Sequence, residues 1–178
     1  MKRSILVPIV TILCAAALLL GLSFGLKGIA EANAQTEHLK MMQTLLPGSV
    51  EFTVEPYSGD DANIRTVHKA ENGFVIETVT AGYAGDITML IGVSKDGTVT
   101  GLVVREMTET MGLGGNALND HEFLAQFLNT SGEAAVGTNV DAISGATVTS
   151  KAITRCVNSA VAYVTGADTD SGATSWGG

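Results

Sequence analysis

The segment from Asp141 to Ser150, with the sequence DAISGATVTS, holds the residues of this chain best suited to chemistry. Its pattern predicts a strand that turns into a helix. Free N–H groups in the first turn of a helix, together with the helix dipole, attract an anion such as a phosphate. Thr147, Thr149 and Ser150 offer hydroxyls that could form hydrogen bonds or be modified. Gly145 would let the backbone approach a ligand closely.

Neighbouring residues fit the same interpretation. Ala146 adds little bulk beside a ligand, and Lys151, one turn beyond Thr147, could help to neutralise an anion. A purely structural interpretation competes with this one, because Ser144 could simply cap the helix, as serine often does. The residue types alone leave both interpretations open.

Three β-branched runs of strand length precede this segment: Phe74–Thr80, Ile87–Val93 and Val99–Val104. Lys95-Asp96-Gly97 is typical of a hairpin turn between the last two. We therefore expect a three-stranded antiparallel meander. Residues 47–72 are polar and turn-rich, and Ser58-Gly59-Asp60-Asp61 is a predicted loop.

Helical patterns follow the strands. Asp120 can cap a short amphipathic helix that contains Phe123, Leu124, Phe127 and Leu128. A β-like stretch is expected at Val136–Ile143. A longer helix is predicted from Thr147 to Val164, with apolar residues at helical spacing. Together with the meander, this predicts an α+β fold in which an antiparallel sheet is flanked by helices.

The N-terminus is different in character. Ile5–Leu26 contains no charged residue, and its 22 residues at about 1.5 Å per residue would span a bilayer. Lys2 and Arg3 precede it, which predicts a cytoplasmic N-terminus and an extracytoplasmic body. Signal-peptide cleavage near Ala32-Asn33-Ala34 is the alternative, but the apolar run is longer than a secretory h-region. We expect residues 1–30 to form this anchor and 31–48 a helical stalk, with a flexible tail over 167–178.

Charge differs between the two parts. The chain has 10 basic and 18 acidic residues; residues 1–30 hold three of the basic ones and no acid, so residues 31–178 carry seven against 18, a net charge of −11. An acidic body argues against nucleic-acid binding, which needs a basic face. Cys14 lies in the apolar run, so a disulfide with Cys156 is not expected; Cys156 is interpreted as a core residue. The sequence contains no Cys/His cluster, so it predicts no metal site.

The motif D-A-I-S-G-A-T resembles the flavinylation motif of the FMN-binding domains in the Rnf and Na⁺-translocating NADH:quinone reductase complexes. In that family a dedicated transferase takes FMN from FAD and esterifies its phosphate to the last Thr or Ser of the motif. The resemblance makes Thr147 the acceptor, in a motif that also includes Asp141, Ser144, Gly145 and Ala146. Thr149 would be a further cofactor-binding residue, and residues 49–166 the FMN-binding domain.

Two more segments carry the resemblance. Gly82–Ile87 is similar to the family's GYGG-I segment, and Glu109–Gly114 to its ETPGLG segment, with Met111 where the family usually has Pro. By resemblance, the cofactor-contacting residues there are Glu109, Thr110, Gly112, Leu113 and Gly114. A solvated surface loop is the structural alternative for Glu109 and Thr110. For Asp141 the alternatives are a role in modification and formation of an Asx turn.

One anchor before a single such domain most resembles the G subunit of the Rnf complex. The resemblance implies a membrane-bound electron carrier with covalent FMN that is part of an enzyme and not catalytic alone. Electrons would pass between ferredoxin and NAD⁺, coupled to Na⁺ or H⁺ movement, with Rnf subunits A, B, C, D and E and the flavin transferase as partners. The C subunit of the quinone reductase is one alternative, and an anchored binding or assembly module without redox function is another.

Overall fold

The computed structural model describes residues 15, 21, 32–107 and 120–167. The chain divides into two compact units, residues 1–41 and 42–178. Residues 32–45 are helical, as expected for the stalk, although the boundaries of the stalk and the other parts remain predictions. No helix within the described residues is long and apolar enough to cross a membrane. The predicted membrane segment Ile5–Leu26, apart from Ala15 and Gly21, lies outside them.

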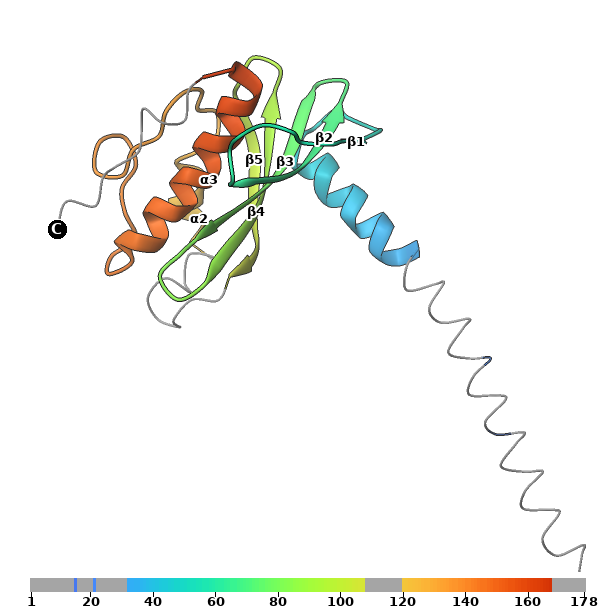
Figure 1. Ribbon diagram of the computed structural model, residues 1–178, viewed down its shortest axis with the longest axis horizontal. Helices are drawn as coiled ribbons and strands as arrows, with labels where there is room; N and C mark the ends of the chain where they lie inside the picture. Colours follow the sequence, from blue (N-terminus) through green and yellow to red (C-terminus); the bar gives the residue numbers. More distant parts are fainter. Residues whose placement is uncertain (1–14, 16–20, 22–31, 108–119, 168–178) are drawn as a thin grey trace, which may run out of the picture. The chain divides into compact units, whose positions relative to one another are not determined.

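The second unit is built on one five-stranded antiparallel sheet with the strand order β1-β2-β3-β4-β5 (Figure 1). The strands are β1 Thr53–Glu55, β2 Ile64–Ala70, β3 Gly73–Ala81, β4 Asp86–Ser94 and β5 Val99–Met107. Each pairs with its neighbour in sequence, so the sheet is a simple meander. The α+β prediction and its antiparallel sheet are confirmed.

The predicted runs correspond to β3, β4 and β5, and the hairpin turn between β4 and β5 is confirmed. Gly97 there has φ +85°, and the Ser94 N–H donates to the Thr98 carbonyl at 2.9 Å. The expectation of only three strands was wrong, because residues 47–72 contribute β1 and β2. β2 carries a bulge between Ile64 and Thr66, which breaks the alternation that marks a strand in sequence.

The two faces of the sheet have separate apolar cores. Val75 in β3 and Leu90 in β4 pack on one face with Met42, Leu45 and Leu46. Their neighbours in sequence point to the other face, as the two-residue period of a strand requires. That second core includes Ile76, Met89 and Ile91 from the sheet and Ile153, Cys156, Val157, Ala160 and Val161 from α3. Both faces of the sheet are thus covered.

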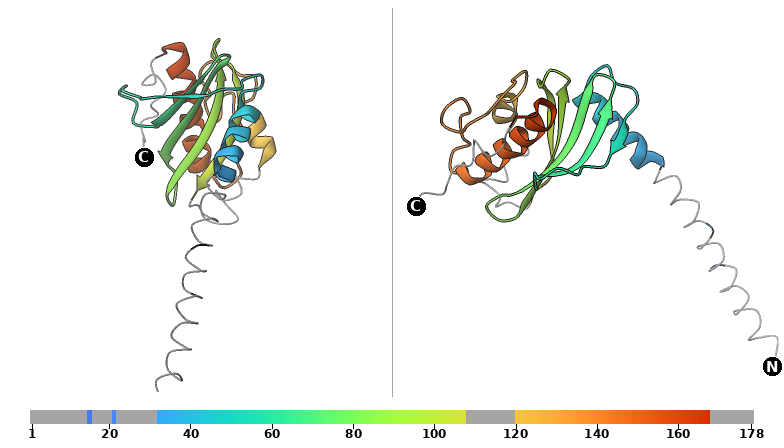
Figure 2. Two further views of the ribbon diagram at one scale, coloured as in Figure 1. Left: turned by 90° about the vertical axis from the view of Figure 1, so that its right-hand side faces the viewer. Right: turned by 45° about the horizontal axis from the view of Figure 1, so that its top comes forward.

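Two helices lie on the side of the larger core. α2, His121–Ala125, is capped by the Asp120 side chain, which accepts from the Phe123 N–H at 2.9 Å. α3, Thr147–Thr165, lies across the sheet in both views (Figure 2) and ends at Gly166, whose φ is +71°. Both helices were predicted. The expected strand at Val136–Ile143 was wrong, because it forms only the isolated bridge between Val136 and Val140.

Candidate functional site

The motif segment lies where the sequence places it, at the start of α3. Thr147 is the first residue of the helix, and Ala146 is its N-cap residue. Ala146 makes no side-chain capping bond, and the first turn holds no acidic residue. The interpretation of Ser144 as the helix cap was therefore wrong. The first N–H groups of α3 have no partner within the helix, as at every helix start, and the cap position leaves them available to an anion.

A tight turn over residues 143–146 immediately precedes α3. The Ala146 N–H donates to the Ile143 carbonyl at 2.9 Å, and Gly145 adopts φ +75° at the third position of this turn. That is the position at which a type II turn requires a positive φ, which glycine adopts without steric cost. Gly145 thus serves the backbone turn, whatever it does for a ligand.

Ser150 fixes this turn from inside the helix. Its Oγ accepts from the Ile143 N–H at 3.0 Å and donates to the Ala146 carbonyl at 2.9 Å. The residue is fully buried, with 0% of its surface exposed. Ser150 therefore has a structural role, and its hydroxyl is not accessible to a modifying enzyme.

Exposure separates the remaining hydroxyls. Thr149 is 1% exposed, whereas Thr147 and Ser144 are exposed. Thr147 is therefore the one threonine in the first turn of α3 whose side chain a large reagent could reach. Its position at the uncapped end of the helix would also favour a negatively charged product.

Asp141 opens the motif on an exposed stretch. Its carboxylate makes no hydrogen bond within the part of the chain that the structure describes, so the Asx-turn interpretation finds no support. Its backbone is held instead by a residue that the sequence did not single out. The side-chain amide of Gln126 contacts both the N–H and the carbonyl of Asp141, at 2.7 and 3.2 Å. Glutamine near the end of an amphipathic helix gives no sequence signal for such a role.

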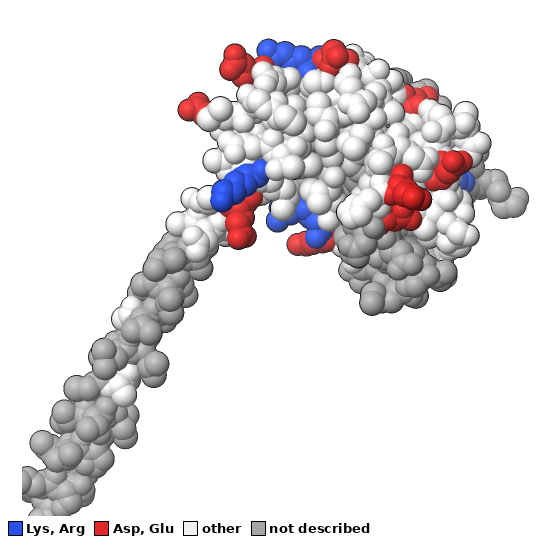
Figure 3. Space-filling model, turned by 180° about the vertical axis from the view of Figure 1, so that it is seen from behind, with Lys and Arg blue, Asp and Glu red and all other residues white. Residues whose placement is uncertain are grey.

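Basic residues follow Thr147 on α3. Lys151 is half-buried, one turn along, and Arg155 is exposed, one turn further. The Arg155 guanidinium donates to the Ala81 carbonyl at 3.1 Å, which ties α3 to the end of β3. β3 leads into the turn that carries Tyr83, whose side chain is 71% exposed. Elsewhere, on the face of the second unit shown in Figure 3, basic side chains lie beside acidic ones.

The predicted cofactor-contacting residues of the glycine-rich loop lie outside the described residues: Glu109, Thr110, Gly112, Leu113 and Gly114. Within residues 32–107 and 120–167, no three His, Cys, Asp or Glu side chains are grouped so that they could hold a metal ion.

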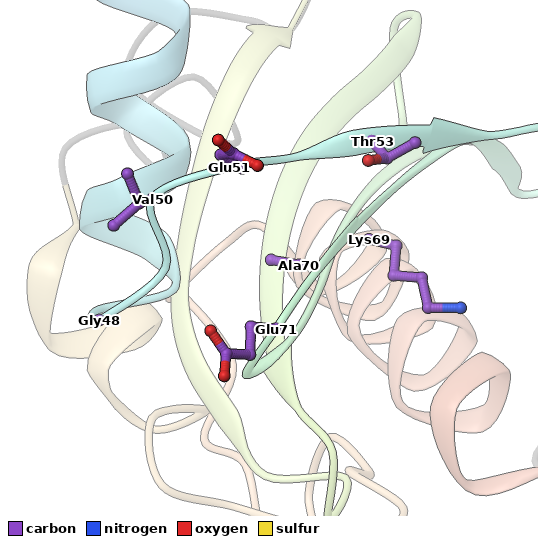
Figure 4. Close-up of a pocket in the computed structure, with 7 residues that line it drawn as sticks. All are labelled: Gly48, Val50, Glu51, Thr53, Lys69, Ala70 and Glu71. Carbon is purple, nitrogen blue, oxygen red and sulfur yellow. The ribbon is translucent and has the colours of Figure 1, made fainter.

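A separate pocket of about 410 Å³ lies beside β1 and β2 (Figure 4). Glu51 and Glu71 lie on opposite sides of Ala70 in this view. Lys69, which also lines the pocket, pairs with Glu55 at 2.8 Å. The pocket shares no residue with the motif segment, so we do not assign the motif's chemistry to it.

Comparisons with known proteins agree with the motif. Residues 82–162 match the model of the FMN-binding domain family. The chain is 35% identical over 177 residues to the G subunit of the ion-translocating oxidoreductase complex of Methanosarcina acetivorans, covering 90% of this chain and 93% of that protein. It is 30% identical to the G subunit of the Na⁺-translocating ferredoxin:NAD⁺ oxidoreductase complex of Acetobacterium woodii, covering 75% and 76%.

Two further similarities are more limited in extent. The G subunit of the proton-translocating ferredoxin:NAD⁺ oxidoreductase complex of Clostridium ljungdahlii is 37% identical over 99 residues, covering 52% of this chain and 53% of that protein. The crystal structure of Shewanella oneidensis NqrC superposes with a TM-score of 0.45 at 21% identity, covering 71% and 73%. The long match to the Methanosarcina protein decides the assignment: the chain belongs to the family of G subunits of ion-translocating oxidoreductase complexes, and it contains an FMN-binding domain.

Proposed function

We propose that this protein is the electron-transfer G subunit of an ion-translocating ferredoxin:NAD⁺ oxidoreductase complex and carries FMN on Thr147. The family assignment supports the first part. The observation that carries the second is the exposure of Thr147 at an uncapped helix start, beside the buried hydroxyls of Thr149 and Ser150.

Attachment would form a phosphoester between the Thr147 Oγ and the phosphate of FMN. With FAD as donor, the Thr147 oxygen would replace AMP on the FMN phosphorus: the pyrophosphate bond would break, and AMP and the hydroxyl proton would be released. The phosphodiester retains one negative charge. The first N–H groups of α3 and the dipole of the 19-residue helix favour that charge at this position.

Bound in this way, the flavin would supply one- or two-electron chemistry. The chain's own residues would hold the phosphate end of the flavin and leave its ring free to exchange electrons with neighbouring subunits. Lys151 would add positive charge one turn from the phosphate. Asp141, exposed on the same segment, would act during attachment, by orienting Thr147 or by contacting the transferase.

We place the protein in the membrane through Ile5–Leu26, with the flavin domain outside the cytoplasm. The support is the uncharged length of this segment and the Lys2-Arg3 pair that precedes it. Membranes that contain the protein should keep it in the pellet after alkaline carbonate extraction. Release into the supernatant at full length would contradict the anchor.

The attachment is tested by denaturing electrophoresis of protein produced in a host that carries the flavin transferase. The wild-type band should fluoresce as a flavin, and Thr147→Ala should abolish the fluorescence. Thr149→Val, which keeps the shape of the buried side chain, is the matched control and should remain fluorescent. A non-fluorescent wild-type band would overturn the covalent attachment. Loss of fluorescence only in Thr149→Val would assign the attachment to Thr149 instead.

A further inference from the structure

Gln126 forms a two-point contact with the backbone at the start of the motif. Its Oε1 accepts from the Asp141 N–H at 2.7 Å, and its Nε2 donates to the Asp141 carbonyl at 3.2 Å. A backbone N–H needs an acceptor and a carbonyl needs a donor, so only one orientation of the amide satisfies both. Two bonds from one rigid, planar group fix the direction of the chain at Asp141 as well as its position.

The segment that carries Gln126 packs on the core of the domain. Gln126 is the C-cap residue of α2. In sequence it follows Phe123 by three residues and directly precedes Phe127, and these two side chains are 3% and 0% exposed. Their rings pack edge to face with centroids 5.4 Å apart. Beyond them, the Thr130 carbonyl accepts from the Val99 N–H at 2.9 Å, which joins this segment to β5. Gln126 itself is half-buried and its two bonds lie at the surface, so the amide joins this packed segment to the motif.

The motif loop is thus attached at two places. Gln126 holds its first residue, Asp141, and Ser150 holds Ile143 and Ala146 immediately before Thr147. Ala142, Ser144 and Gly145 remain exposed between and beside these attachments. A segment ordered before it is recognised loses less conformational entropy on binding than a flexible one.

We infer that Gln126 is a positioning residue for flavin attachment: it holds the Asp141 backbone so that the transferase meets the loop and Thr147 already ordered. This rests on the proposed function, because it concerns delivery of FMN to Thr147. The Gln126 amide contacts the backbone of Asp141, six residues before Thr147, so its effect would be on recognition of the loop by the transferase.

The test is a kinetic one, with the full-length protein in detergent, purified flavin transferase, FAD and a divalent cation. Gln126→Leu removes both hydrogen bonds at similar volume. We expect it to raise the KM of the transferase for this protein about tenfold, as expected for two ordinary hydrogen bonds, with kcat nearly unchanged. Gln126→Glu keeps the acceptor and loses the donor, and should fall between. Gln43→Leu is the matched control, because Gln43 makes one bond of 3.4 Å to the Val50 carbonyl, outside the motif.

A second readout does not depend on flavin. In Gln126→Leu, hydrogen–deuterium exchange should increase in peptides that cover Asp141–Ala146, while peptides from β3 and β4 stay protected. Wild-type kinetics in both Gln126 variants would overturn the inference, as would a general loss of protection across the sheet that accompanies the rise in KM. Failure of the wild-type protein to accept FMN would overturn the proposed function instead.

Discussion

The hydroxyl oxygen of Ser150 lies 3.0 Å from the backbone nitrogen of Ile143 and accepts its hydrogen bond inside the protein. Ser150→Ala would leave that N–H and the Ala146 carbonyl without this partner at a fully buried position. We expect the free energy of unfolding to fall by about 1–3 kcal/mol. Urea unfolding, followed by far-UV circular dichroism, measures the change.

Ser144→Ala is the control for this prediction. Ser144 is exposed and does not cap α3, so its loss should change stability by no more than about 0.5 kcal/mol. Equal effects of the two substitutions would show that the Ser150 bonds do not stabilise the turn.

The backbone of the motif depends on Gly145, whose φ is +75°. A β-carbon is disfavoured in this left-handed region by about 1–2 kcal/mol. Gly145→Ala should therefore lower the melting temperature, and Gly145→Asn should lower it less, because Asn visits this region more readily. Differential scanning fluorimetry of the two variants tests the order. A higher melting temperature for Gly145→Ala than for Gly145→Asn would contradict the proposed turn geometry.

The sequence predicted the parts of the fold whose pattern is local. β3, β4 and β5 are β-branched runs, and α3 shows a helical period over its whole length. β2 was missed because its bulge places Ile64 and Val67, three residues apart, in the same core. β1 has three residues and no buried one, so it had almost no apolar pattern to find.

After α2, the sequence predicted a strand that the structure does not contain. Val136–Ile143 has the composition of a strand, but Gly137 turns the chain with φ +84°. Asn139 then closes a loop, accepting from the Ala135 N–H at 2.7 Å and donating to the Glu133 carbonyl at 3.0 Å. Side-chain bonds of this kind replace a ladder with another strand.

For the proposed site, the sequence motif by itself points to Thr147. The burial of Thr149 and Ser150 could not be read from it, because both are as polar as Thr147. Gln126 was also beyond the sequence, since its contact with Asp141 joins two segments 15 residues apart. Three-dimensional packing separates the exposed hydroxyl of Thr147, the proposed acceptor, from the buried hydroxyls beside it.

Two glycines of the sheet lie against the end of the helix formed by residues 32–45. Gly92 in β4 lies opposite Gly101 in β5, and a β-carbon on Gly92 would meet the Leu45 carbonyl oxygen at 2.1 Å. On Gly101 it would meet the Leu45 Cα at 2.8 Å. Thr100 also donates its hydroxyl to the Leu45 carbonyl, at 2.6 Å. The backbone of the helix end thus lies directly on the sheet.

Gly92→Ala should displace that helix end and cost about 1–3 kcal/mol of stability, as overpacking usually does. Gly101→Ala should act on the same contact. Once Leu45 has moved for one substitution, the second meets less resistance, so the double variant should lose less than the two single variants together. Chemical unfolding of the four proteins tests this. Strict additivity would show that the glycines do not share one contact.

Cys156 gives a prediction about pH. Burial raises the pKa of its thiol from 9.0 to about 11, and the neighbouring side chains of Thr78 and Arg155 only partly oppose this. Between these two pKa values the unfolded chain has lost a proton that the folded chain keeps, so stability falls as pH rises. Two pKa units correspond to about 2–3 kcal/mol. The contribution is complete below pH 9 and is lost by about pH 11.

Cys156→Ala isolates this effect, because other groups that titrate in the same range are present in both proteins. At pH 8 the wild type should be the more stable, since alanine leaves a cavity in the core beside Val157. That advantage should shrink by about 2–3 kcal/mol as the pH approaches 11. Urea unfolding of both proteins at several pH values measures it. A difference in stability that stays constant with pH would mean that the thiolate is accommodated in the fold, and that the side chain is less enclosed than its packing indicates.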